Sequence, residues 1–120
     1  MLTMDNNLKY SIIYASIRPE ISEQISVGLI IMDGEGLDFR YSKQKLKALE
    51  GLFPEKEYKF ISSVVSNMKK NGTIHTEADV NYLTRYSNNM ITFSPVKSIE
   101  MPPTIRNKDW LFRNYVYNGK

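Results

Sequence analysis

The amino-acid sequence predicts an α+β fold, a two-layer sandwich in which a mainly antiparallel sheet of about four strands packs against roughly three to four helices. Three observations support this prediction. Apolar, β-rich segments joined by short links come first, and short links are typical of antiparallel neighbours. Segments with helical periodicity follow as a block. A last apolar run and a C-terminal helical segment complete the order β-β-β-α-α-α-β-α.

The first two strands are predicted at residues 8–16 and 24–32. Pro19 separates them, because proline lacks a backbone donor and fixes its own φ. The run Val-Gly-Leu-Ile-Ile-Met that ends the second segment is almost continuously apolar, which indicates a central strand covered on both faces or nearly so. A side chain at Gly28 would intrude into close packing there, so we expect this glycine to matter for folding.

A tight turn is predicted at residues 33–36, Asp-Gly-Glu-Gly, since glycine adopts a positive φ without a Cβ clash. Residues 37–41 then alternate Leu, Phe and Tyr with Asp38 and Arg40, which predicts a half-buried third strand hairpinned onto the second. The two glycines stand between strands and not at a strand-to-helix junction. Neither the dinucleotide fingerprint nor the Walker pattern is present, so nucleotide binding is rejected.

The first two helices are predicted from a cap and from apolar spacing. Ser42 is a suitable N-cap for a short helix. The apolar residues of that helix fall on one stripe: Leu46, Leu49 and Phe53. Its lysines face elsewhere: Lys43, Lys45 and Lys47. Residues 55–71 form the clearest predicted helix, because apolar residues recur at the spacing of an amphipathic helix. These residues are Ile61, Val64, Val65 and Met68.

The second half of the chain has weaker signals. A third helix is predicted from residue 77 to about residue 87, with Thr76 as a suitable start. Residues 90–94 then read as a last strand. We expect an irregular chain over residues 97–108, which contain two consecutive prolines. A short C-terminal helix is predicted at residues 109–117.

Length and composition favour one domain spanning residues 1–120, with residues 1–7 expected to fray. Hydrophobic residues make up 42% of the chain, which is enough for a core. The chain has no cysteine, which excludes disulfides, thiolate metal sites and cysteine nucleophiles. No apolar run approaches the roughly 20 residues that span a membrane, and the N-terminus lacks an apolar signal-peptide region. These features predict a cytoplasmic protein without a membrane partner.

No catalytic site, cofactor site or metal site is predicted. The single histidine, His75, reads as a loop residue near a helix start. No serine stands in a nucleophile-elbow context. Asp33, Glu35 and Asp38 are close in sequence, but they fit the polarity of a turn and a hairpin better than a site for a hard cation. The chain is therefore predicted not to be an enzyme.

Two segments carry candidate contacts to a partner. The link between the first two strands is charged, and an ion pair there would orient a partner group. The C-terminal segment mixes tyrosine, tryptophan and arginine, which dominate binding hot spots, although half-buried core positions explain most tyrosines equally well. Two further arginines would complete a pocket if the fold brought them to the link. The candidate partner-binding residues are Arg18, Glu20, Glu23, Arg40, Arg85, Trp110, Arg113 and Tyr115.

Several motifs resemble a small bacterial family, domain of unknown function 3037. In the first half they are Tyr10-Ser11-Ile12-Ile13, Glu23-x-x-x-Val27-Gly28-Leu29-Ile30-Ile31, Asp33, Tyr41-Ser42 and Leu46-x-x-Leu49-x-x-Leu52-Phe53-Pro54. Near the end they are residues 89–94 and Leu111-Phe112-x-x-Tyr115-Val116. The resemblance spans most of the chain, and its motifs are mostly core and turn residues. The family's usual asparagine before Val-Gly is Ser26 in this chain.

The resemblance implies a regulatory role and no catalysis. Genes of that family are paired with genes for HipA-type serine/threonine kinases, the toxin class of bacterial persistence modules. We therefore expect a non-catalytic interaction module, an accessory or antitoxin-like partner of such a kinase. The resemblance carries over no catalytic residues.

Two other functions stay open at this point. The net charge of +3 and the lysines of the first helix leave nucleic-acid binding as an alternative, although the 16 basic residues are spread among 13 acidic ones. A metal-dependent hydrolase or nuclease that uses Glu20, Glu23 and Asp33 is the second alternative, because carboxylates suit hard cations. Homodimerisation through an exposed sheet edge is also open.

Overall fold

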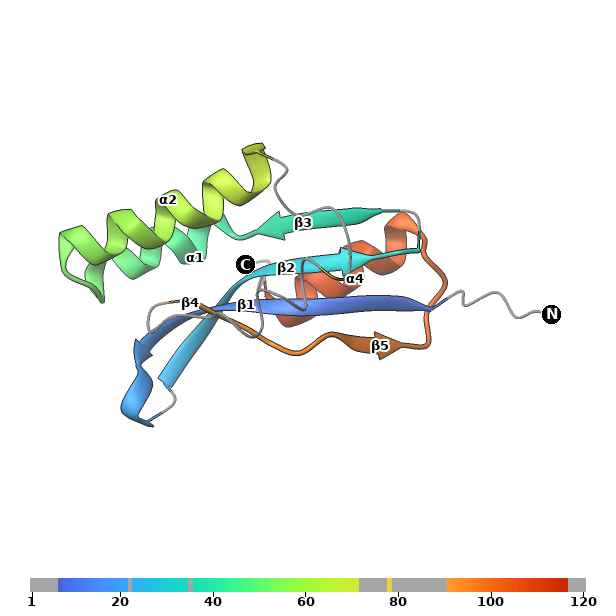
Figure 1. Cartoon of the computed structure of the whole chain (residues 1–120), viewed down its shortest axis with the longest axis horizontal. Coiled ribbons are helices and arrows are strands. Elements are labelled where there is room, and N and C mark those ends of the chain that lie inside the picture. The colour runs from blue at the N-terminus through green and yellow to red at the C-terminus, as the bar shows by residue number, and fades with distance from the viewer. Residues whose placement is uncertain (1–6, 22, 35, 72–77, 79–90, 117–120) are drawn as a thin grey trace.

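A five-stranded antiparallel sheet is central in the computed structural model, which describes residues 7–21, 23–34, 36–71, 78 and 91–116 (Figure 1). The strands are β1 (Leu8–Arg18), β2 (Glu23–Met32), β3 (Leu37–Tyr41), β4 (Ile91–Phe93) and β5 (Lys97–Ile99). The helices of the described part are α1 (Lys43–Ala48), α2 (Glu55–Asn71) and α4 (Ile105–Tyr115), with 3₁₀ turns η1 (Pro19–Ile21) and η2 (Leu49–Gly51). The predicted α+β class with a mainly antiparallel sheet is confirmed, and the sheet has five strands where about four were predicted.

β1 is the strand around which the sheet is built. It pairs with β2 along one edge and with β4 and β5 along the other. β3 pairs with β2, so the described strands run in the order β3-β2-β1-β4, with β5 beside β1 as well. Each of these pairings is antiparallel, as the short links between the first three strands predict.

Helices pack on both faces of the sheet, because alternate residues of a strand point to opposite sides. Leu29 and Ile31 of β2 join a buried cluster with Leu111 of α4. Ile30 and Met32 join the other cluster, to which α1 and α2 contribute. Figure 1 shows α4 crossing behind the sheet, while α1 and α2 lie together beside the end of β3. The prediction of a second strand covered on both faces is therefore confirmed.

Gly28 of β2 is closely packed between its two neighbouring strands, β1 and β3. A Cβ atom built on it would lie 3.1 Å from the backbone oxygen of Arg40 and 3.2 Å from Cδ1 of Ile13. The residue next to it, Val27, interrupts the pairing of β2 with β1, since the register shifts by one position there. A side chain at position 28 therefore has no room without movement of the sheet.

The predicted turn and the predicted cap are confirmed. Gly34 has φ of 91°, and the turn is closed by a 2.9 Å hydrogen bond from the amide of Gly36 to Oδ1 of Asp33. Ser42 accepts a 3.1 Å hydrogen bond from the amide of Lys45 and so caps α1. The predicted apolar stripes of α1 and α2 supply buried residues: Leu46, Leu49, Ile61 and Val65. The helix predicted at residues 77–87 falls almost entirely outside the described residues.

The boundaries near the C-terminus differ from the prediction. The expectation of an irregular chain over residues 97–108 is wrong, because this stretch holds β5 and the first turn of α4. α4 begins at Ile105 rather than at residue 109, since Thr104 accepts a 3.1 Å hydrogen bond from the amide of Asn107 and caps it. The two prolines that favoured a loop precede this cap and leave the helix intact.

A serine pair bridges the gap between β4 and β5. The register against β1 shifts by one residue between these strands, and Pro95 lies in the gap. The amide of Ile12 donates to Oγ of Ser94 at 2.8 Å, while Oγ of Ser11 donates to the backbone oxygen of Ser94 at 2.6 Å. The Ser94 side chain thus takes the place of a backbone acceptor that the irregular strand does not supply.

We expect Ser94→Ala to lower the free energy of unfolding by about 1–2 kcal/mol, because it removes the acceptor of the Ile12 amide. Urea unfolding followed by circular dichroism measures this loss. Ser98→Ala, at an exposed position of β5, is the matched control and should change stability by less than about 0.5 kcal/mol. Equal stability of the two variants would show that the hydroxyl of Ser94 does not support the sheet.

Candidate functional site

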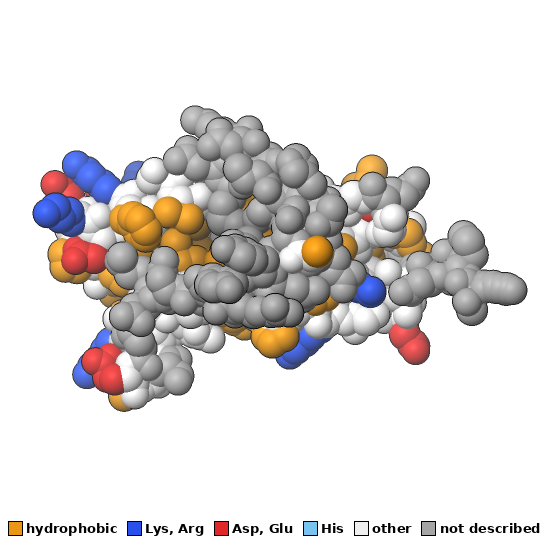
Figure 2. Space-filling model, in the orientation of Figure 1, with side chains coloured by type: hydrophobic (Ala, Val, Ile, Leu, Met, Phe, Trp, Pro, Cys, Tyr) orange, Lys and Arg blue, Asp and Glu red, His pale blue; other side chains and the backbone are white. Residues whose placement is uncertain are grey.

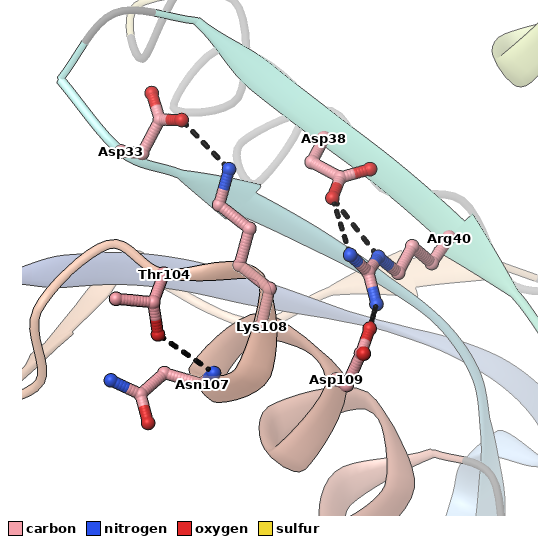
Figure 3. Close-up of polar contacts among 7 residues, drawn as sticks. All are labelled: Asp33, Asp38, Arg40, Thr104, Asn107, Lys108 and Asp109. Carbon is pink, nitrogen blue, oxygen red and sulfur yellow. Dashed lines mark hydrogen bonds and ion pairs between the residues drawn. The ribbon is translucent and has the colours of Figure 1, made fainter.

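α4 is fixed to the sheet by charged contacts at two places (Figure 3). Near its first turn, Nζ of Lys108 lies 2.7 Å from Oδ2 of Asp33, which begins the turn after β2. One residue further, Oδ1 of Asp109 lies 2.6 Å from the Arg40 guanidinium of β3. The same guanidinium lies 2.9 Å from Oδ2 of Asp38. These contacts join elements that are far apart in sequence and set the position of the helix.

Arg40, a predicted partner-binding residue, is therefore engaged within the chain. Its side chain is only 22% exposed, and it bonds to carboxylates on both sides. Burial lowers the pKa of the Arg40 guanidinium, but its hydrogen bonds to Asp38 and Asp109 outweigh burial and hold that pKa above its ordinary value. Arg40 therefore links β3 to α4 through these two carboxylates.

The charged link residues Arg18, Glu20 and Glu23 are exposed at the tip of the β1–β2 hairpin. Figure 1 shows this hairpin bending away from the rest of the sheet, and Figure 2 shows acidic and basic side chains together at its tip. Ile21, between them, is 60% exposed. The charged link residues are therefore exposed together at one end of the sheet.

The link residues do not converge with Arg40. Through the strand pairings, Arg40 is level with Ile12 of β1. Ile12 and Arg18 are six positions apart in the strand, which corresponds to about 20 Å of extended chain. Arg85, the other arginine proposed to complete a pocket, lies outside the described residues.

The carboxylates considered for a metal-dependent enzyme are also separated. Glu23 begins β2, and Asp33 directly follows its last residue. β2 has 10 residues, so about 30 Å of extended strand lies between them. Asp33 also pairs with Lys108, which neutralises its charge. Glu23 and Asp33 are therefore too far apart to bind the same cation.

The C-terminal candidates divide between the two sides of α4. Trp110 is 39% exposed and Arg113 is exposed. Tyr115 is half-buried, with its ring centroid 5.2 Å from that of Tyr10 on β1 and 6.1 Å from that of Trp110. Burial raises the pKa of the Tyr115 hydroxyl, with a further contribution from its hydrogen bond to Tyr10. The ring of Tyr115 thus packs between those of Tyr10 and Trp110, while Trp110 and Arg113 face solvent.

Arg106 belongs with these exposed residues, and sequence reasoning missed it. It lies one turn before Trp110 on the same side of α4 and is exposed. It was missed because residues 97–108 were expected to be irregular. The signal that would have placed it on the helix is Thr104, which follows two prolines and precedes the helical segment as an N-cap.

A second junction, formed by Lys45, Ser26 and Tyr115, ties α1 to the end of α4. Nζ of Lys45 donates to the backbone oxygen of Ser26 at 3.0 Å and contacts Oγ of Ser26 at 3.1 Å. That hydroxyl donates in turn to the backbone oxygen of Tyr115 at 2.9 Å. Of the three lysines predicted to face away from the apolar stripe of α1, Lys45 is thus half-buried against Ser26 of β2, whereas Lys43 and Lys47 are exposed.

The ammonium group of Lys45 gives the junction a pH dependence. Burial lowers the pKa of Lys45 below its ordinary 10.5, so the unfolded chain holds that proton more tightly than the folded one. Stability should consequently rise with pH in the window just below 10.5. We expect Lys45→Met to remove this rise, as measured by urea unfolding between about pH 8 and about pH 10.

Lys47→Met is the matched control, because Lys47 is on the same helix and exposed. It should keep the pH dependence of the unmodified protein. The ionisation of Tyr115 affects all three proteins equally and cancels in the comparison. An unchanged slope in Lys45→Met would show that the amino group is solvated in the folded state.

Within the described ranges, no group of three or more His, Cys, Asp or Glu side chains is arranged to hold a metal ion. The predicted loop histidine, His75, and one turn carboxylate, Glu35, lie outside those ranges. Among the described helices, none is both long and apolar enough to cross a membrane. Compared with protein-family models, with curated proteins and with solved structures, the chain finds no match.

Proposed function

We propose that this protein is a non-catalytic interaction module that binds and regulates another protein in the cytoplasm. The observation that carries this proposal is the exposed Trp110 on a helix that is clamped to the sheet. Tryptophan and arginine are the residue types that contribute most to binding hot spots. A contact residue on a rigid element loses little conformational entropy on binding, which favours affinity.

The partner that we propose is a HipA-type serine/threonine kinase. The support is the resemblance of the sequence to the family named above, whose genes are paired with genes for such kinases. In this role the protein is an accessory or antitoxin-like subunit. Its exposed surfaces, the hairpin tip and the outer side of α4, are where contact with the kinase is expected.

Co-purification tests this function. The tagged protein and a HipA-type kinase encoded in the same genome are expressed together, and we expect them to elute as one complex. Autophosphorylation of the kinase with and without the protein then gives the sign of the regulation. Failure of the two purified proteins to associate at micromolar concentration would contradict the proposal.

Nucleic-acid binding is the less favoured function. Its main support in the sequence was the set of lysines on α1, and Lys45 is directed to Ser26 rather than to solvent. The remaining exposed lysines of α1 are Lys43 and Lys47. Retention of the protein on heparin that falls steeply as the salt concentration rises would support nucleic-acid binding.

A further inference from the structure

The outer stripe of α4 consists of Arg106, Trp110 and Arg113. These positions have the spacing i, i+4 and i+7, which places them on one side of a helix. The opposite side carries Leu111, which is 0% exposed in the core. All three stripe residues are exposed, and the two arginines are about 10 Å apart along the helix axis.

The charges of the stripe are unbalanced. The other cations near it are neutralised within the chain, since Lys108 pairs with Asp33 and Arg40 pairs with Asp38 and Asp109. Among the described residues, Arg106 and Arg113 make no ion pair. Within the described part of the chain, two guanidinium groups without an ion pair therefore flank one exposed indole ring on a helix that is fixed to the sheet.

We propose that the outer stripe of α4 binds an acidic segment of a partner protein, in which carboxylates flank an apolar residue. This inference rests on the proposed function and names the surface and the chemistry of its partner. Guanidinium groups form bidentate bonds with carboxylates. In an extended peptide, residues i, i+2 and i+4 lie on the same side, and the outer two are about 13 Å apart. Two carboxylates at i and i+4 are therefore within reach of the long arginine side chains, with an apolar residue at i+2 between them. The apolar residue between them lies on Trp110.

A protein segment fits this surface better than a nucleic acid does. Asp109 borders the stripe on the same helix, and its side chain is 50% exposed although it pairs with Arg40. A carboxylate in that position repels a continuous phosphate backbone, whereas a peptide places its few charges only opposite the arginines. The single indole also suits one apolar anchor, while single strands are held by stacking of successive bases.

Trp110 is the only tryptophan of the chain, so its fluorescence reports directly on this surface. The probe is the synthetic peptide Glu-Asp-Leu-Phe-Asp-Glu, titrated into the full-length protein at low and at high salt. We expect a saturable change in tryptophan emission that weakens as salt increases. The neutral peptide Gln-Asn-Leu-Phe-Asn-Gln should bind about tenfold more weakly, since two exposed ion pairs are lost.

Variants show whether the stripe is the binding surface. Arg106→Gln combined with Arg113→Gln should weaken binding of the acidic peptide about tenfold. Lys43→Gln combined with Lys47→Gln removes the same charge from exposed positions of α1 and should leave binding unchanged. Thermal unfolding of both variants confirms that the fold is kept. Equal binding of the acidic and neutral peptides, or equal loss in both variants, would overturn the proposal.

A nucleic-acid titration and the kinase co-purification distinguish this inference from nucleic-acid binding and from the proposed kinase partner. An oligothymidylate that binds more tightly than the acidic peptide and depends on the same arginines would overturn it in favour of a nucleic acid. No saturable response to the acidic peptide would overturn it as well. If the kinase then still co-purifies, the proposed function stands without this surface. If the peptide binds and no kinase associates, the surface stands and the proposed kinase partner falls.

Discussion

Replacing Gly28 with alanine should lower the free energy of unfolding by about 1–3 kcal/mol. A methyl group there would meet the backbone oxygen of Arg40 at 3.1 Å and the side chain of Ile13 at 3.2 Å. Ile13 can shift by rotation, but the backbone of Arg40 is held by β2 and by the carboxylates that Arg40 binds. The added group therefore strains β3 as well as the core. Urea unfolding followed by circular dichroism measures the loss.

Gly51→Ala is the matched control, because a Cβ atom at position 51 would meet nothing within 4 Å. It should be neutral or slightly stabilising, since alanine reduces the entropy of the unfolded chain. Glu23→Gln, at the exposed hairpin tip, should change stability by less than about 0.5 kcal/mol and affect partner binding instead. If Gly28→Ala were as stable as Gly51→Ala, the close approach of the three strands would be refuted.

Leu111→Ala should have a still larger effect, a loss of about 2–5 kcal/mol. Leu111 is 0% exposed and packs in the cluster that joins α4 to β1 and β2, with Leu8, Leu29 and Ile31. Its truncation removes buried apolar surface and leaves a cavity that the fixed sheet cannot close. Because α4 carries the outer stripe, partner binding should weaken together with stability.

Two variants test whether this loss comes from packing. Ile105→Ala removes a side chain of similar size that is 75% exposed on the same helix, so stability should change by less than about 0.5 kcal/mol. Leu111→Met keeps most of the volume and should lose less than about 1.5 kcal/mol. Similar losses for Leu111→Ala and Ile105→Ala would mean that helix propensity, and not the buried cluster, determines stability here.

Local signals in the sequence were sufficient for most of the first 71 residues. The apolar run that ends β2, the turn at Gly34 and the cap at Ser42 each depend on neighbouring residues, and each appears in the structure as predicted. β5 could not be predicted in this way. It has 3 residues, Lys-Ser-Ile, without a strand pattern of its own, and it is a strand because β1 offers it an edge.

The candidate site was less predictable because it depends on contacts between distant residues. Trp110, Arg113 and the hairpin-tip residues could be selected by residue type and are exposed. Nothing local indicates that Arg40 pairs with Asp109 across 69 positions, or that Lys45 is directed to Ser26. Both contacts follow from how the helices dock on the sheet, which the sequence pattern of a single element does not contain.

The position of β1 also governs the order in which the sheet can form. Its contact between Ser11 and Ser94 joins residues that are 83 positions apart. During synthesis, β1, β2 and β3 can pair as soon as residue 41 has emerged, whereas the strands that cover the other edge of β1 come only with residues 91–99. In the interval that edge can capture strands of other chains. We therefore expect fragments that end before residue 91 to aggregate where the full chain folds.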